Sequence, residues 1–395
     1  MKLLFVVNNF NFGGPQKSLL NLLYELEDKE VDVDLIILNN QTQLGKYLPK
    51  YVNIVEVDSR IALLMLAKDG ILKKMLKNIM HPIFNAKVCF FLIKSLLKLQ
   101  ENVKAKQKFW VKNRWIAKDK KQYYDYAIGV SGGHSIYYIV DYINAKHKIG
   151  WIRTDYRVLN RNHNIDNDYF KKIDGMLSVS SMCANIFEDI FQIQPKVYYN
   201  SLPIKLYENL QSEKVELIED TVNICTICRL DYGKGLDLLI DAAKILKEKK
   251  INISWYIVGT GKLENWLNDE ISKNQLQNIV KPLGFKFNTG SIIEKMDFLV
   301  HPSRFEGKSN TIDEALHYNK PVIATNFETV YEQIKSGENG YVVSMNGYEI
   351  AKKVIKLAND NLLLEKMKNN INSNLILKTD KGNEFLNIIR GFGKD

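Results

Sequence analysis

The sequence predicts an α/β protein with two doubly wound, parallel-sheet domains of the Rossmann-like type. Short apolar runs typical of buried strands alternate with amphipathic helical segments in both halves of the chain. A polar stretch at residues 201–221 separates the two alternating series. The length of 395 residues exceeds what one hydrophobic core usually serves, so two domains are expected.

The first half, residues 1–200, is expected to form the N-terminal domain. An apolar run at residues 2–8 predicts a buried strand, and a Gly-Gly turn followed by Pro15 predicts the start of a helix over 13–26. A helix is also expected at 180–191, and further strands at residues 33–38, 53–57, 124–130, 147–153, 175–180 and 196–200.

Residues 222–375 repeat the alternation and are expected to form the second domain. The pattern predicts strands at 222–228, 253–259, 297–303 and 321–325, and helices at 235–249, 261–273, 309–318 and 330–337. Residues 201–221 are interpreted as a hinge about which the two domains close over a cleft. Residues 376–395 are predicted to be a C-terminal helix that packs back on the N-terminal domain.

The composition excludes several classes of protein. With 25% charged and 46% hydrophobic residues, the chain is globular rather than disordered or fibrous. Its 4 cysteines are too few for a disulfide scaffold and fit a reducing cytoplasm. No run approaches the roughly 20 apolar residues of a membrane span, and no signal-peptide cleavage site follows the N-terminus. We therefore expect a cytoplasmic protein.

The excess of basic over acidic residues lies in one segment of the chain. Residues 60–121 hold 16 Lys and Arg against 3 Asp and Glu, while the net charge of the whole chain is +10. Apolar residues recur there at helical spacing between the lysines, which predicts an amphipathic insertion at an anionic membrane surface. Core-facing helices with solvated lysines are the alternative, and no nucleic-acid module is present. The predicted membrane contacts are Lys73, Lys74, Lys77, Trp110 and Trp115.

Candidate binding residues follow the predicted strands, where open parallel sheets bind ligands. Gly13 and Gly14 could let the backbone approach a phosphate at a helix N-terminus, although a plain tight turn is an equal interpretation. The dinucleotide fingerprint G-x-G-x-x-G is absent, which argues against a nicotinamide or flavin oxidoreductase.

The second half carries a more specific set. Arg229 and Lys234 lie five residues apart on a loop that enters a helix, where two cations could clamp a diphosphate, unless both are merely solvated. Gly259 follows the next strand and could bring the backbone close to a nucleotide. Glu306 and Glu314 flank a helix start whose free amides favour anionic groups.

These motifs resemble the retaining glycosyltransferases of family 4, which have the two-domain GT-B fold. The resemblance rests on R-L-x-x-x-K-G, then G-x-G, then P-S-x-x-E-G-x(6)-E-A, followed by K-P-V-I-A. It covers the second half in order and spacing, and it extends to the Gly-Gly pair of the first half.

The resemblance implies a role for each matching residue. Arg229 and Lys234 would hold the donor diphosphate, Glu306 the hydroxyls of the donor sugar, and Glu314 the ribose of the nucleotide. The loop Gly307, Lys308, Ser309, Asn310 and Thr311 would bind phosphate and sugar through its amides. Leu283 to Phe285 would border the base, and Gly14 would approach the diphosphate.

The chain departs from the family pattern at one position. The family often has a histidine after the first-domain strand that is written HKIGWIRTDYR here, where it contacts the donor sugar. This sequence has Arg153 at that place and Asp155 two residues later, so both are catalytic candidates. His134, in a Gly-Gly-His loop, is a third candidate, for which a packing role is the alternative.

We therefore predict a retaining glycosyltransferase of bacterial surface polysaccharide biosynthesis, peripheral at the inner face of the cell membrane. The donor would be a nucleoside diphosphate sugar, with UDP favoured over GDP, and the acceptor a lipid-linked saccharide. No cofactor or metal is expected, because Arg and Lys would stabilise the diphosphate. The alternatives are a GT-B sugar-nucleotide epimerase or phosphorylase, or a non-catalytic membrane-surface scaffold.

Overall fold

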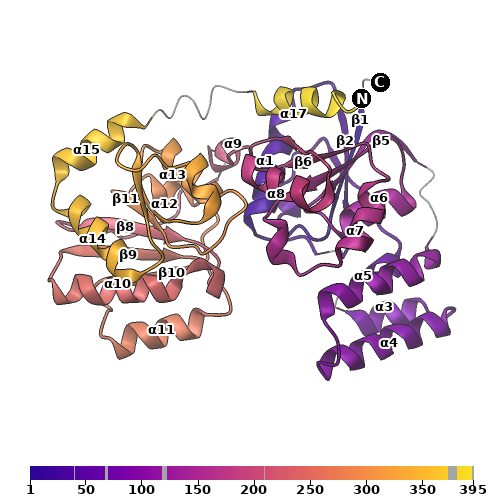
Figure 1. Cartoon of the computed structure of the whole chain (residues 1–395), viewed down its shortest axis with the longest axis horizontal. Coiled ribbons are helices and arrows are strands. Elements are labelled where there is room, and N and C mark those ends of the chain that lie inside the picture. The colour runs from indigo at the N-terminus through magenta and orange to yellow at the C-terminus, as the bar shows by residue number, and fades with distance from the viewer. Residues whose placement is uncertain (40, 67–69, 118–121, 209, 372–379, 394–395) are drawn as a thin grey trace. The chain divides into compact units, whose positions relative to one another are not determined.

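The computed structural model describes residues 1–39, 41–66, 70–117, 122–208, 210–371 and 380–393. The chain forms two compact α/β units (Figure 1), Met1–Ser201 with Lys381–Asp395, and Leu202–Asp380. We interpreted residues 201–221 as a hinge; Ser201 ends the N-terminal part of the first unit, while Leu202 and the short helix α9 (Ile204–Glu208) belong to the second. The C-terminal segment belongs to the first unit.

The first unit is built on a 7-stranded parallel sheet in the order β3-β2-β1-β4-β5-β6-β7. The inner strands are almost continuously apolar because helices cover both faces of such a sheet. Its strands are β1 (Lys2–Val7), β2 (Asp32–Ile37), β3 (Val52–Ile54), β4 (Tyr123–Val130), β5 (Asn144–Ile152), β6 (Gly175–Ser178) and β7 (Lys196–Val197).

The helices of the first unit include the C-terminal helix of the chain. The ring of Phe385, in that helix, lies between those of Phe5, Trp151 and Tyr198, with centroid distances of 5.3 to 5.7 Å. The α-helices described are α1 (Gly14–Glu25), α2 (Ser59–Leu64), α3 (Ile71–Lys77), α4 (Pro82–Leu96), α5 (Asn102–Asn113), α6 (His134–Tyr142), α7 (His163–Phe170), α8 (Ser181–Phe191) and α17 (Lys381–Arg390). Single 3-10 turns are η1 (Gly45–Tyr47), η2 (Arg114–Ile116) and η3 (Tyr156–Leu159).

The basic segment contains α3, α4 and α5 as well as most of α2 and the turn η2, and it packs against the rest of the first unit. Phe84, Val88 and Trp110 lie in one apolar cluster with residues of β1 and β4. Pro82 is the first residue of α4, where its missing N–H costs nothing and its fixed φ suits a helix start. Within the part of the chain that the structure describes, no helix is long and apolar enough to cross a membrane.

The second unit has a 6-stranded parallel sheet in the order β10-β9-β8-β11-β12-β13. Its strands are β8 (Val222–Ile227), β9 (Ile253–Val258), β10 (Val280–Gly284), β11 (Phe298–His301), β12 (Val322–Thr325) and β13 (Gly340–Val343). The edge strands β10 and β13 were not predicted, because they are short and Pro282 is typical of an edge rather than a central strand.

The helices predicted at residues 235–249, 261–273 and 309–318 are present in the second unit, and the one predicted at 330–337 is not; four of the helices described there were not predicted. At 330–337 the structure has only the 3-10 turn η5 (Glu328–Glu332). The predicted helix is therefore wrong, because Thr329 and Gln333 form tertiary hydrogen bonds with the loop at residues 306–309. The other helices are α10 (Leu236–Glu248), α11 (Glu264–Lys273), α12 (Gly290–Ile293), α13 (Asn310–His317), α14 (Gly347–Ala358) and α15 (Asn361–Asn370), with the turn η4 (Tyr232–Lys234).

Candidate functional site

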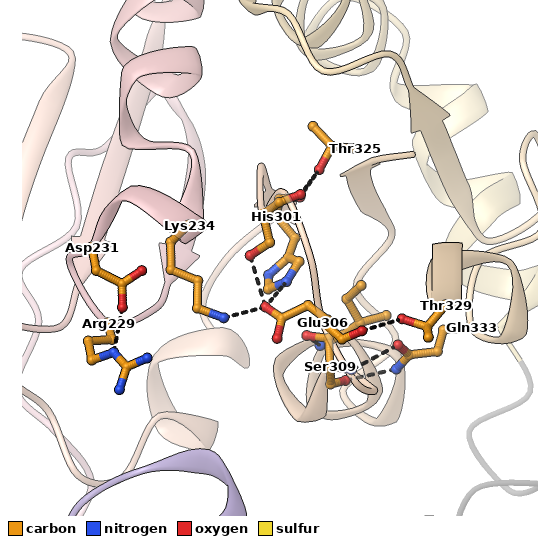
Figure 2. A network of polar contacts seen from close by, with 11 residues as sticks. Arg229, Asp231, Lys234, His301, Glu306, Ser309, Thr325, Thr329 and Gln333 are labelled. Carbon is orange, nitrogen blue, oxygen red and sulfur yellow. Dashed lines mark hydrogen bonds and ion pairs between the residues drawn. The ribbon is translucent and has the colours of Figure 1, made fainter. Parts of the chain in front are cut away.

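A carboxylate with three donors lies at the carboxyl ends of two neighbouring strands of the second unit. Glu306 follows β11 and Lys234 follows β8; the Lys234 Nζ lies 2.5 Å from the Glu306 Oε1. Ser303 Oγ donates to the same oxygen at 2.9 Å, and His301 Nε2 lies 3.1 Å from it. Since a carboxylate only accepts hydrogen bonds, His301 carries its proton on Nε2. Figure 2 shows Lys234 and His301 directed at Glu306.

Glycines bring these loops together. A Cβ on Gly235, whose φ is +65°, would lie 2.0 Å from the carbonyl oxygen of Pro302. A Cβ on Gly259 would lie 1.9 Å from that of Cys228, and one on Gly261 2.3 Å from that of Leu230. The glycines after β8 and β9 therefore allow backbone to pack on backbone, which is a structural reason for the G-x-G spacing.

Lys234 and Glu306 form a largely buried ion pair, which keeps Glu306 ionised. The side chains of Lys234 and Glu306 are only 19% and 15% exposed. Burial by itself raises the pKa of Glu306, but the charge of Lys234 and the hydrogen bond from His301 outweigh it and hold the pKa well below its usual range. Glu306 is thus a permanent carboxylate near neutral pH.

Arg229 and Lys234, predicted as a clamp, have different partners. The Arg229 side chain is 76% exposed, and its Nε donates to Asp231 Oδ2 at 2.6 Å. Exposed pairs of this kind contribute little stability, about 0–1 kcal/mol, so Arg229 can change partner at small cost. Lys234 is the cation fixed at the carboxylate.

The start of α13 differs from the prediction at one amide. Ser309 caps the helix, and its Oγ accepts from Ile312 N at 3.4 Å. The Ser309 amide donates to Gln333 Oε1 at 3.1 Å, and Gln333 Nε2 donates back to the Ser309 carbonyl at 2.8 Å. This corrects the assignment of the Ser309 amide to a phosphate, since a side chain already occupies it. Asn310 and Thr311 form the first turn, where helix amides lack intrahelical acceptors.

The neighbours of Ser309 in this loop include a buried ion pair. Lys308 Nζ contacts Asp313 Oδ2, and both side chains are almost fully buried. Gln333 Nε2 also donates to Asp313 Oδ1 at 2.7 Å. Gly307 precedes this pair and is buried. Lys308 and Gln333 both bond to Asp313 and so fix the conformation of the loop at residues 307–309. Lys308 is therefore a buried, ion-paired residue and not a solvated cation.

Glu314 is oriented by two hydroxyls that the sequence did not single out. Its Oε2 accepts from Thr289 Oγ1 at 3.0 Å and from Tyr207 OH at 3.1 Å, and the carboxylate is buried. Tyr207 lies 107 residues away in α9, and Thr289 precedes α12. No local pattern marks either one. His301, by contrast, lies within a predicted strand next to the E-G motif and could have been chosen on that ground.

The loop predicted to border a base lies at the edge of the second sheet. Leu283 packs partly buried against the core inside β10, while Phe285 is 42% exposed beyond its end. Gly284 between them has a φ of +67°, which turns the chain there. The exposed ring of Phe285 lies beyond the carboxyl end of β10, where a base could stack on it, whereas the side chain of Leu283 packs against the core.

The first-unit candidates follow β1 and β5. Gly13 is in extended conformation at the N-cap of α1 and Gly14 is its first residue, so neither is strained. Arg153 is 8% exposed, and its Nη2 donates to the carbonyl of Pro15 at 3.2 Å. Asp155 caps η3 and forms a 2.7 Å ion pair with Arg157, so its carboxylate already has a structural task.

His134 begins α6 after β4, and its ring lies in an aromatic cluster with Trp110. Trp110 is 0% exposed, and its Nε1 donates to Asp141 Oδ2 at 2.8 Å, so the prediction that it contacts a membrane is wrong. The His134 ring packs edge-on against Trp110 and Tyr137, at 5.4 Å from each. Burial lowers the pKa of His134 to about 3, which fits a neutral packing residue.

The outer side of the insertion is both apolar and basic. Lys73 and Lys77 are exposed, Lys74 is half-buried, and Trp115 is 59% exposed. We call the following set of exposed apolar side chains the α3–α4 surface; Asn85 ties the two helices together by donating to the carbonyls of Met75 and Asn78. It consists of Leu72, Leu76, Ile79, Met80, Ile83, Phe90, Ile93, Leu96 and Leu97.

The sequence predicted no metal site. The described residues contain no group of three or more His, Cys, Asp or Glu that could hold a metal ion. Cys225 and Cys228 are free thiols. Burial raises the pKa of both to about 12, so neither is a thiolate at neutral pH.

Sequence comparison places similarity in the second unit. Residues 208–374 match the family described as glycosyl transferases group 1. An uncharacterised glycosyltransferase of Methanocaldococcus jannaschii is 31% identical over 169 residues, covering 41% of this chain and 42% of that protein. The capsular polysaccharide biosynthesis glycosyltransferase CapM of Staphylococcus aureus is 29% identical over 170 residues, 41% of this chain and 43% of CapM. The matched region thus spans less than half of these relatives.

A third relative is the poly(ribitol-phosphate) alpha-N-acetylglucosaminyltransferase of Staphylococcus aureus. It is 26% identical over 195 residues, which is 48% of this chain and 37% of that protein. All three relatives are named as glycosyltransferases, and each alignment covers less than half of this chain and less than half of the relative.

Solved structures extend the similarity to both units. Anabaena HepE in complex with UDP-glucose superposes with a TM-score of 0.69 and 15% identity, covering 99% of this chain and 100% of HepE. Staphylococcus aureus TarM, solved with UDP, gives a TM-score of 0.68 and 13% identity over 100% of both chains. The predicted fold class is confirmed: the chain has the GT-B fold, and its second unit matches the glycosyl transferases group 1.

Proposed function

We propose that the protein is a retaining glycosyltransferase of bacterial surface polysaccharide biosynthesis. It moves a sugar from a nucleoside diphosphate sugar to a hydroxyl of a lipid-linked glycan at the inner face of the cell membrane. The observation that carries this proposal is the cluster of Lys234, His301, Ser303 and Glu306, because it lies at the carboxyl edge of the sheet within the matched segment.

The cluster suits a diphosphate leaving group. Negative charge grows on the diphosphate as the bond to the sugar breaks, and preorganised cations and amides stabilise it. Lys234 supplies a positioned charge and Arg229 an exposed guanidinium, and the amides of Asn310 and Thr311 lie in the first turn of α13. UDP in the HepE and TarM structures favours a UDP-sugar over a GDP-sugar.

Glu306 would bind the sugar without exchanging protons. Its low pKa keeps it ionised, so it accepts hydrogen bonds from sugar hydroxyls but cannot act as a general acid. This fits a reaction in which the acceptor attacks from the face that the diphosphate leaves, while the departing phosphate takes the proton of the acceptor. Glu314 would bind the ribose, and no metal is required in this scheme.

The α3–α4 surface supports a membrane-bound acceptor. Exposed apolar side chains of this size mark interaction sites, and the neighbouring lysines favour an anionic partner. Ile83 and Phe90 of α4 lie seven residues apart and share one face of the helix, while Val88 packs into the core on the other. Lys94 Nζ lies 4.5 Å from the centroid of the Phe90 ring, so charge borders the apolar face. An anionic bilayer surface matches both properties.

Binding of nucleotide sugars tests the proposal. Titration calorimetry with UDP-glucose, UDP-N-acetylglucosamine and GDP-mannose should show binding of the UDP-sugars, and Lys234→Ala should weaken it by about 1.5–3 kcal/mol. Lys244→Ala is the matched control, since Lys244 is a half-buried lysine that is paired with Asp241 in the same unit. Absence of nucleotide binding, or equal binding by the Lys234 and Lys244 variants, contradicts the proposed donor site.

A further inference from the structure

Arg153 is a buried guanidinium that has no carboxylate partner among the residues that the structure describes. It is the first residue after β5, is 8% exposed, and stacks on the Trp151 indole with its Cζ 4.3 Å from the ring centroid. Nη2 donates to the Pro15 carbonyl, whereas Nη1 has no hydrogen-bond partner among the described residues.

Other arginines of the same unit show what a structural role looks like. Arg161 is also buried, and it forms two hydrogen bonds to Asp166, at 2.7 and 2.9 Å. Arg114 is paired with Asp141 at 3.1 Å. Arg161 and Arg114 are thus each paired with a carboxylate, whereas no described carboxylate compensates the charge of Arg153.

The surroundings of Arg153 make the local potential more positive. Pro15 is in the first turn of α1, and the N-terminus of a helix carries partial positive charge. That first turn has no acidic residue, and no side chain caps it. Burial lowers the pKa of Arg153 to about 9, so the guanidinium remains charged at neutral pH. A buried unpaired charge is unfavourable, so a bound anion would relieve a cost that the unliganded fold bears.

The geometry of Arg153 is that of a receptor for a planar or tetrahedral oxyanion. Its face is covered by Trp151 and one edge is held by Pro15, which fixes the guanidinium before any ligand arrives. Nη1 is itself buried and has no hydrogen-bond partner among the described residues, and Arg153 directly follows β5, at the end of a parallel sheet where ligands bind. Guanidinium groups bind carboxylate and phosphate through paired hydrogen bonds.

We propose that Arg153 binds the negatively charged group of an acidic sugar substrate, either the carboxylate of a uronic acid or a phosphate ester. This inference rests on the proposed function and narrows it, because a neutral sugar would leave the guanidinium uncompensated. Arg153 then selects charged over neutral substrates.

Inorganic phosphate is the first probe, applied to the full chain saturated with UDP so that the donor site is occupied. Phosphate should raise the Tm of the wild type by about 2–4 °C at a tenfold excess over Kd, relative to KCl of equal ionic strength. Arg153→Gln should abolish this rise, and Arg153→Lys should keep part of it. The control Arg157→Gln, which removes an exposed arginine already paired with Asp155, should respond like the wild type.

Two pairs of sugars then locate the charged group. Calorimetry with UDP-glucuronic acid against UDP-glucose tests the donor, and glucuronate against glucose, with UDP present, tests the acceptor. An Arg153-dependent preference of tenfold or more for the acidic member of one pair assigns the anion to that substrate.

A phosphate-induced Tm rise that persists in Arg153→Gln overturns the inference, and so does its absence from the wild type. A packing role for Arg153 would instead appear as a lower Tm of Arg153→Gln in KCl with no change in the phosphate response. Failure of the proposed function shows separately, as loss of UDP binding by the wild type.

Discussion

Replacing apolar residues of the α3–α4 surface tests membrane docking most directly. Leu72, Leu76, Ile79 and Ile83 are between 69% and 74% exposed, so the quadruple substitution to serine removes no core packing. Surface substitutions of this kind change the free energy of unfolding within about 0.5 kcal/mol each. A loss of vesicle binding by this variant would therefore report on docking rather than on unfolding.

The exposed fractions set the expected size of the effect. Full burial of a Leu or Ile side chain is worth about 1.5–3 kcal/mol, so about 70% of it gives roughly 1–2 kcal/mol per residue. Four residues could contribute about 4–8 kcal/mol if fully inserted. Half of that, about 2–4 kcal/mol, already corresponds to a roughly 30- to 1,000-fold weaker partition onto vesicles.

Co-sedimentation with vesicles at low and high salt separates the two contributions. The apolar part should persist at high salt, whereas the lysine part, about 1 kcal/mol for each residue near the surface, should fade as the Debye length shortens. Replacing Lys73, Lys74 and Lys77 by glutamate should therefore release the protein mainly at low salt. Leu362→Ser is the control, since Leu362 is 86% exposed on α15 of the other unit.

Sedimentation of the quadruple serine variant at wild-type level would refute the reasoning. So would equal binding of the wild type to neutral and to anionic vesicles at low salt, because the lysines would then contribute nothing.

Three further predictions concern single residues. Arg229→Ala should weaken UDP binding by less than Lys234→Ala in calorimetry, because Arg229 is mostly exposed while Lys234 is fixed at Glu306. Burial raises the pKa of Glu306, but Lys234 and His301 lower it by more, so the pKa of Glu306 is lower in the folded protein than in the unfolded chain. Ionised Glu306 therefore stabilises the folded state fully above its unfolded pKa, near 4.3. This contribution is lost as the pH falls towards the folded pKa. The Tm difference between wild type and Glu306→Gln should thus shrink on acidification below about pH 4, and a constant difference would contradict the pairing. Trp110→Phe should lower the free energy of unfolding in urea by about 1–3 kcal/mol, since Asp141 loses a buried donor, whereas the exposed Trp115→Phe should change it by less than 0.5 kcal/mol.

Local patterns predicted where the donor-site residues lie along the chain. Lys234, Glu306 and Glu314 each follow or flank a buried strand or helix start, and the carboxyl ends of parallel strands meet at one edge. The bond between Lys234 and Glu306, which are 72 residues apart, was not predicted as a contact. The sequence spacing of two loops does not fix the distance between them. Here Gly235, next to Lys234, lets the backbone lie close to Pro302 on the loop that carries Glu306.

The sequence could not show which polar groups already have partners. The Ser309 amide was predicted to be available, and Gln333 occupies it. Tyr207 lies in a stretch that we interpreted as a hinge, yet its hydroxyl orients Glu314. Both contacts join segments that are far apart in the chain, and hydrogen-bond partners leave no periodic trace in the sequence.

The same distinction holds for the basic insertion. By itself, the sequence determined the alternation of strands and helices, the charge excess of residues 60–121 and the break at Pro82, because periodicity, composition and proline geometry are local properties. Only the tertiary structure decided that Trp110 is buried against Asp141 while Trp115 is exposed, and that none of the described carboxylates pairs with Arg153. Burial and charge pairing depend on which elements meet in space, and a one-dimensional pattern does not contain that information.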